Sequence, residues 1–132
     1  MSQPVRIGHY QIIEELGRGA QSSAWLADAG DGPVLLKSLR IAAGDDDAPR
    51  ARFYREIVGV ACLERTGLVR LIDVGEWDDN PFYVVPFRPG KSLAQRLRAG
   101  PLSADEAMKV FCAVAAGLDA LHGVGFVHRD IK

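Results

Sequence analysis

The sequence predicts an α+β fold, in which a five-stranded antiparallel sheet with one packed helix is followed by a helical region. Three observations favour this class. Strand-like segments occur three in a row before the first helix and two in a row after it, which is the order of an antiparallel sheet rather than of βαβ units. The first three segments are joined by short glycine-bearing turns. The most regular helical pattern comes last in the chain.

Length and composition are those of a globular chain. Its 132 residues suit one domain, and with 48% apolar and 25% charged residues it is too apolar for disorder. Sixteen Lys and Arg against seventeen Asp and Glu give a net charge of −1. This balance provides no basic surplus for binding nucleic acid or an anionic membrane, so we expect no nucleic-acid partner.

Cysteine usage and hydropathy indicate a reducing compartment. The two cysteines, Cys62 and Cys112, exclude a disulfide scaffold and a cysteine-rich zinc site. The first six residues contain no apolar export core, and the uncharged stretch 110–118 is too short to cross a bilayer. We therefore expect a cytoplasmic protein.

The N-terminal part predicts three strands after a loose arm. The arm covers the first eight residues, and the strands are expected at residues 10–16, 24–28 and 34–39. A glycine-rich turn, Gly17–Ser23, separates the first two strands. Gly30–Pro33 has the glycine and aspartate content of a hairpin between the second and third strands.

A helix and two further strands follow. Acidic residues at 45–47 and Pro49 predict a helix start. Phe53, Ile57 and Val60 then recur at helical spacing and form one apolar face. Strands are expected at 69–74 and 82–85, with a turn cluster between them.

The last part of the chain predicts helices. A short helix is expected at 92–98. Ser103 and Glu106 have the spacing of a capping box, in which each side chain satisfies a backbone donor of the other residue. Apolar residues follow at steps of three and four to Leu121, and glycines near residue 123 end the helix. Residues 126–132 return to an extended or loop character.

Four features point to phosphate chemistry, and each has a plainer interpretation when taken alone. Gly17 and Gly19 let backbone amides approach phosphates closely, but they also suit an ordinary hairpin. Lys37 in an apolar strand needs a negative partner, or it is an edge-strand lysine that blocks aggregation. Glu56 on the next helix is either that partner or a solvated carboxylate. His128-Arg129-Asp130 provides a hydroxyl acceptor, or it is a polar loop.

Together these four features form an ordered set from Gly17 to Asp130. On them the sequence resembles the N-terminal part of a eukaryotic-type protein kinase and is similar to the bacterial Ser/Thr kinases. The resemblance covers Tyr10 to Lys132. It implies ATP-dependent phosphoryl transfer to a protein serine or threonine, with ATP and Mg²⁺ as cofactors and a protein as substrate.

The resemblance assigns roles by position. It implies catalytic roles for Asp130, which accepts the substrate hydroxyl proton, for Lys132 and for Lys37, which holds the α- and β-phosphates. By the same resemblance, Val85 falls at the gatekeeper position and residues 86–88 form the hinge between the lobes. The carbonyl of Pro86 would accept a hydrogen bond from adenine, and the backbone N–H of Arg88 would donate one. The implied nucleotide-binding residues are Leu16, Gly17, Gly19, Ser22, Ala24, Leu35, Lys37, Glu56, Val85, Pro86 and Arg88.

The sequence departs from the family pattern at three positions of this set. Ser22 replaces the third glycine, Ala24 replaces a valine over the adenine, and Leu35 replaces an alanine. The last two changes roughly offset in volume, so we expect Leu35 to fill the space that Ala24 leaves.

The resemblance also divides the chain into an N-terminal arm (1–9), a sheet-bearing lobe with its hinge (10–88) and the start of a helical lobe (89–132). The family's magnesium ligands would follow Lys132, so we expect no metal ligand within the chain and no useful turnover from these 132 residues alone. The apolar face of the last helix then remains for a missing lobe, a partner chain or self-association. The alternative function is a non-catalytic, pseudokinase-like module that binds nucleotide or a partner.

Overall fold

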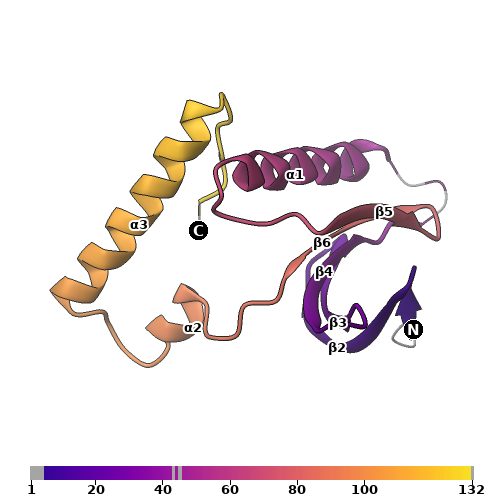
Figure 1. Ribbon diagram of the computed structural model, residues 1–132, viewed down its shortest axis with the longest axis horizontal. Helices are drawn as coiled ribbons and strands as arrows, with labels where there is room; N and C mark the ends of the chain where they lie inside the picture. Colours follow the sequence, from indigo (N-terminus) through magenta and orange to yellow (C-terminus); the bar gives the residue numbers. More distant parts are fainter. Residues whose placement is uncertain (1–4, 43, 45, 132) are drawn as a thin grey trace. The chain divides into compact units, whose positions relative to one another are not determined.

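The computed structural model describes residues 5–131 except residues 43 and 45. The chain forms two compact units, Met1–Phe87 and Arg88–Lys132. The first contains an antiparallel sheet with one helix, and the second contains two helices (Figure 1). The α+β architecture expected from the sequence is confirmed.

The sheet runs in the order β1-β2-β3-β4-β6-β5, and each neighbouring pair is antiparallel. Its strands are β1 (Arg6–Ile7), β2 (Tyr10–Arg18), β3 (Ser22–Asp28), β4 (Pro33–Leu39), β5 (Asp73–Trp77) and β6 (Asn80–Pro86). Strands β2, β3, β4 and β6 extend slightly beyond the expected segments, because backbone pairing continues into the turns.

A sixth strand, β1, adds to the five that were expected. Arg6 pairs with Gln11 and Ile7 with Tyr10, in a segment that was expected to be a loose arm. Gly8 has φ +58°, which permits the tight turn between β1 and β2. A two-residue strand is too short to show a period in the sequence, and burial of Ile7 (1% exposed) holds it in place. Residues 1–4 of the expected arm lie outside the described residues.

The strand expected at 69–74 begins later, at Asp73. Val69 and Leu71 pack against the apolar cluster beside the helix without being part of a strand. Their alternation in the sequence therefore reflects burial of a connecting segment. The backbone N–H of Ile72 still donates to the carbonyl of Val84 at 2.8 Å, which leads the chain into β5.

The two faces of the sheet carry separate apolar clusters, because alternate side chains of a strand point to opposite faces. The first contains Ile7, Tyr10, Ile12, Trp25, Ala27, Val34, Leu36, Phe82 and Val84. The second lies against helix α1 (Ala48–Arg65), which runs beside β5 and β6 (Figure 1), and contains Leu39, Phe53, Ile57, Tyr83 and Val85. Pro49 lies in the first turn of α1, as the sequence predicts.

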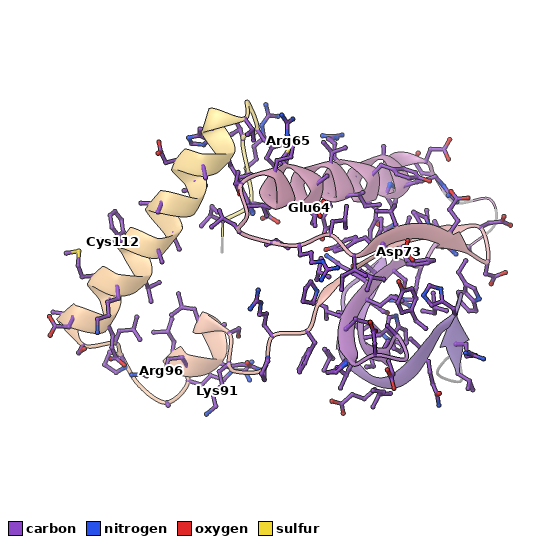
Figure 2. All side chains as sticks on the ribbon, in the orientation of Figure 1. Glu64, Arg65, Asp73, Lys91, Arg96 and Cys112 are labelled. Atoms are coloured by element: carbon purple, nitrogen blue, oxygen red, sulfur yellow. The ribbon has the colours of Figure 1, made fainter. Side chains whose placement is uncertain are left out.

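A buried tyrosine ties the first strands to the edge of the sheet. The Tyr10 hydroxyl donates to Asp73 Oδ2 at 2.8 Å, and Figure 2 shows Asp73 among the strands. Burial, with the hydrogen bond and the charge of Asp73, raises the pKa of Tyr10 to about 12. The phenol therefore stays a neutral donor at physiological pH.

The second unit contains α2 (Leu93–Leu97) and α3 (Ala104–Gly123). The capping box predicted for Ser103 and Glu106 is confirmed, and Ser92 forms a second one with Gln95. Arg96 of α2, labelled in Figure 2, donates to both carboxylate oxygens of Glu106 at 3.1 Å. This ion pair joins the two helices at the start of α3.

None of the helices in the described part of the chain is both long and apolar enough to span a lipid bilayer. Cys62 on α1 and Cys112 on α3 are both free thiols, and Cys112 is exposed on its helix (Figure 2).

Candidate functional site

An ion pair joins the middle of the sheet to α1. The Lys37 Nζ atom donates to Glu56 Oε1 at 2.5 Å, so the contact expected from the sequence is confirmed. Lys37 lies on β4, on the face that carries Leu39 of the helix-side cluster. Glu56 lies on α1 between the buried residues Phe53 and Ile57. Docking of these two apolar neighbours turns the Glu56 carboxylate toward the sheet.

A tyrosine that the sequence analysis did not identify completes this group. Tyr83 on β6 is the cross-strand partner of Lys37, and its hydroxyl donates to Glu56 Oε1 at 2.8 Å. Tyr83 is 7% exposed. Burial raises its pKa well above the usual value, and the charge of Glu56 and the hydrogen bond to it act in the same direction. The available signal was alternation, since Tyr83 and Val85 are two residues apart and share a face.

The turn between β2 and β3 carries the expected glycines. Leu16, Gly17 and Gly19 are exposed, and the Gly19 N–H donates to the Ser22 carbonyl at 2.8 Å to close the turn. A Cβ atom added to Gly17 would meet nothing within 4 Å. The backbone of this turn is therefore open to an approaching ligand.

Arg40, at the end of β4, braces the same turn and was also missed by the sequence analysis. Its guanidinium donates to the Gly19 carbonyl at 2.8 Å, and its backbone N–H donates to the Gln21 carbonyl at 2.8 Å. These contacts fix the turn between Gly19 and Ser22 to the strand that carries Lys37. Their sequence separation hid them, because Arg40 is 21 residues from Gly19.

Three further sheet residues of the predicted site, Ala24, Leu35 and Val85, share the face of Lys37. Ala24 is the cross-strand partner of Lys37, and Leu35 is the partner of Val85. Val85 is buried, whereas Ala24 and Leu35 are partly exposed. Pro86, also partly exposed, ends β6. The sheet thus brings Ala24, Leu35, Lys37 and Val85 into one neighbourhood.

A cavity of about 210 Å³ opens beside the ion pair, between α1 and the ends of β3 and β4. Its lining mixes charged, polar and apolar side chains: Gln21, Ser22, Leu39, Pro49, Arg52, Phe53 and Glu56. Ser22 connects this cavity to the glycine-bearing turn. The lining thus carries the Arg52 guanidinium and the Glu56 carboxylate, and Lys37 lies next to it through its ion pair with Glu56.

The other predicted residues lie in the second unit. Arg88 begins that unit and is exposed. Asp130 is exposed, and its backbone N–H donates to His128 Nδ1 at 3.2 Å. Arg129 adopts φ +63°, a left-handed conformation that is uncommon for a residue with a side chain. Lys132 lies outside the described residues. Within residues 5–131, excluding 43 and 45, no group of three or more His, Cys, Asp or Glu side chains could hold a metal ion.

Comparison with known proteins gives consistent matches. Residues 10–132 match the family model of the protein kinase domain. The chain is 35% identical over 127 residues to a probable serine/threonine-protein kinase PknB of Lactococcus lactis, a match that covers 93% of this chain and 20% of that protein. It is 37% identical over 136 residues to the serine/threonine-protein kinase PksC of Streptomyces coelicolor, covering 95% of this chain and 24% of that protein.

A solved structure gives the same result. The crystal structure of the Mycobacterium tuberculosis PknI kinase domain matches with a TM-score of 0.78 at 28% identity, over 100% of this chain and 57% of that one. The chain spans a quarter or less of the length of these curated relatives and just over half of the solved domain. The expected resemblance is confirmed: the chain belongs to the protein kinase family and is similar to bacterial serine/threonine-protein kinases.

Proposed function

We propose that this chain binds ATP through its first unit and is the nucleotide-binding part of a protein serine/threonine kinase. The observation that carries the proposal is the ion pair between Lys37 and Glu56 beside an open, glycine-bearing turn. A lysine held at a carboxylate is oriented, so it offers phosphates a fixed cation rather than a flexible one.

The proposed nucleotide contacts follow the sheet. The backbone of Gly17, Gly19 and Ser22 covers the phosphates, and Lys37 binds the α- and β-phosphates while Glu56 orients it. Leu16, Ala24, Leu35 and Val85 supply apolar surface for the adenine. The carbonyl of Pro86 and the N–H of Arg88 serve as acceptor and donor for the adenine edge.

The proposed transfer step uses the second unit. Asp130 accepts the proton of the substrate serine or threonine hydroxyl while the oxygen of that hydroxyl attacks the γ-phosphorus of ATP. The bond between the γ-phosphorus and the oxygen of the β-phosphate breaks in the same step. Lys132 balances charge on the transferred group. The Mg²⁺ that the family uses neutralises phosphate charge when bound, but the described residues contain no cluster that would hold it, so we assign it no ligand in this chain.

Calorimetric titration of the chain with ATP, with and without magnesium, tests the binding proposal. We expect Lys37→Met to weaken ATP binding by about tenfold or more, because a charge-assisted contact to phosphate is lost. The control is Lys91→Met, which removes an exposed lysine of the second unit (Figure 2) and is expected to leave the affinity unchanged. Equal ATP affinity for Lys37→Met and the unchanged chain would refute the site.

Transfer is tested separately, in the protein that contains this chain and with a serine- or threonine-containing acceptor protein. Asp130→Asn is expected to abolish phosphorylation while leaving ATP affinity unchanged. Binding without any transfer would instead assign a non-catalytic nucleotide-binding module.

A further inference from the structure

We propose that Tyr83 is a positioning residue for the nucleotide site: its hydroxyl holds Glu56 toward Lys37, so that the lysine is preset for phosphate. This inference rests on the proposed function, since it names a residue that tunes the same site. No position of the expected site included Tyr83, and its part follows from three features of its surroundings.

The first feature is register. Tyr83 and Lys37 are direct partners on the antiparallel strands β6 and β4, so their side chains leave the same face of the sheet side by side. The two side chains donate to the same acceptor atom. Glu56 Oε1 accepts from Lys37 Nζ at 2.5 Å and from the Tyr83 hydroxyl at 2.8 Å. A single carboxylate oxygen on α1 therefore has two donors from adjacent strands.

The second feature is the rigidity of the phenol. The Tyr83 ring belongs to the apolar cluster between the sheet and α1, with its centroid 5.7 Å from that of Phe53. A tyrosine has two side-chain torsions, and packing fixes both here, whereas a lysine has a flexible four-carbon stem. The position of the Tyr83 hydroxyl is thus set by the core, and that hydroxyl gives Glu56 a fixed point to bond.

The third feature is protonation. Because burial and the Glu56 charge raise the Tyr83 pKa, the phenol remains a neutral donor across the physiological range. Tyr83 also keeps its contact when Lys37 turns part of its hydrogen bonding toward a bound phosphate. Glu56 then retains one donor, and α1 need not shift when the ligand arrives.

Binding of two ligands separates positioning from a merely structural role. ATP engages Lys37 through its phosphates, and adenosine has no phosphates. We expect Tyr83→Phe to weaken ATP binding by about fivefold to tenfold, the effect of losing one hydrogen bond to a charged acceptor. Adenosine affinity is expected to remain unchanged. General loosening of the unit would lower both affinities together, and that result, or an unchanged ATP affinity, would overturn the proposal.

Tyr10→Phe is the matched control. Tyr10 is also a buried tyrosine that donates to a carboxylate, Asp73, at 2.8 Å, and it belongs to the cluster on the other face of the sheet. The Tyr10→Phe change is expected to leave the affinities for ATP and for adenosine unchanged. In a Glu56→Gln background, Tyr83→Phe should have little further effect on ATP affinity, because both changes act on one contact. Full additivity of the two changes would overturn the proposal.

A measurement without nucleotide tests the positioning role of Tyr83 separately from the proposed ATP binding. In a chain with ¹³C-labelled tyrosine, Tyr83→Phe identifies the Tyr83 Cζ resonance, and Glu56→Gln should shift that resonance while those of Tyr10 and Tyr54 stay in place. A resonance that does not move would overturn the proposed hold of Tyr83 on Glu56. A chain that binds neither ATP nor adenosine would refute the proposed function, and the resonance would still decide whether Tyr83 holds Glu56.

Discussion

Two residues beside Lys37 depart from the family pattern in opposite directions. Ala24 is smaller than the usual valine, and Leu35 is larger than the usual alanine. Both lie on the face of the sheet that carries Lys37, on the neighbouring strands β3 and β4, and Leu35 is partnered with the buried Val85. We therefore expect Leu35 to fill the space that Ala24 leaves.

This exchange predicts that Leu35→Ala weakens ATP binding by about tenfold, because it removes apolar surface of roughly three carbon atoms from the expected adenine contact. Titration calorimetry measures the change, with adenosine expected to weaken as much as ATP. Leu68→Ala, at an exposed leucine after α1, serves as the control. Unchanged or tighter binding by Leu35→Ala would show that Leu35 does not fill the space left by Ala24.

Some site residues could be predicted from the sequence and others could not, for a physical reason. Lys37 and Glu56 are charged residues in apolar surroundings, so each needs a partner. Because they carry opposite charges on a strand and on the helix that follows it, an ion pair between them could be predicted. Tyr83 and Arg40 give no such signal. A tyrosine in an apolar strand and an arginine after a strand are both common, so neither residue indicates a functional role in the sequence. Only the register of β4 with β6, and the fold of the turn back onto β4, bring them into the site.

At the scale of elements, the start of the last helix could be predicted from the sequence, whereas the bounds of two strands could not. The start of α3 follows from a capping box within four residues, and the sequence shows it directly. The strand β1 and the late start of β5 are set by backbone pairing within hairpins, in which Ile7 pairs with Tyr10 and Asp73 pairs with Val84. A pairing of this kind leaves no period in a short segment, so tertiary contacts decide its bounds.

The hairpin of β5 and β6 contains one position where only glycine fits. Gly75 is the cross-strand partner of Phe82, whose ring covers it, and an added Cβ would lie 2.7 Å from the Phe82 Cζ atom. Phe82 is 5% exposed and belongs to the cluster on the far side of the sheet from α1, so its ring has little room to move. The close approach of ring and backbone holds β5 at the sheet edge.

Gly75→Ala is therefore expected to lower the free energy of unfolding by about 1–3 kcal/mol, the usual cost of overpacking a filled core. Urea denaturation followed by circular dichroism measures it. Gly123→Ala is the control, since an added Cβ there meets nothing within 4 Å and alanine favours the end of α3. A Gly75→Ala chain as stable as the unchanged one would mean that the Phe82 ring moves aside freely.

At the scale of the whole molecule, the second unit exposes much of its apolar surface. On α3, Met108, Phe111 and Val114 are 62%, 71% and 41% exposed, while Leu121 is buried. The sequence predicted an apolar face on this helix, and the structure leaves most of that face uncovered. Exposed apolar surface of this extent promotes association.

We expect the 132-residue polypeptide to self-associate at high concentration, and Phe111→Lys to reduce this association because a charge would have to be buried in the contact. Sedimentation velocity over a range of concentrations measures the effect. Asp119→Asn, at an exposed position of the same helix, raises the net charge by the same amount and serves as the control. A chain that remains monomeric at every concentration would contradict the expectation.

The shared acceptor atom in the first unit has an evolutionary consequence. Because a phenol and an amine both bond Glu56 Oε1, a descendant that lost the amine at position 37 would keep its helix seated by the phenol alone. In such a lineage, one substitution would remove the cation that binds phosphate and leave the packing of the helix on the sheet intact.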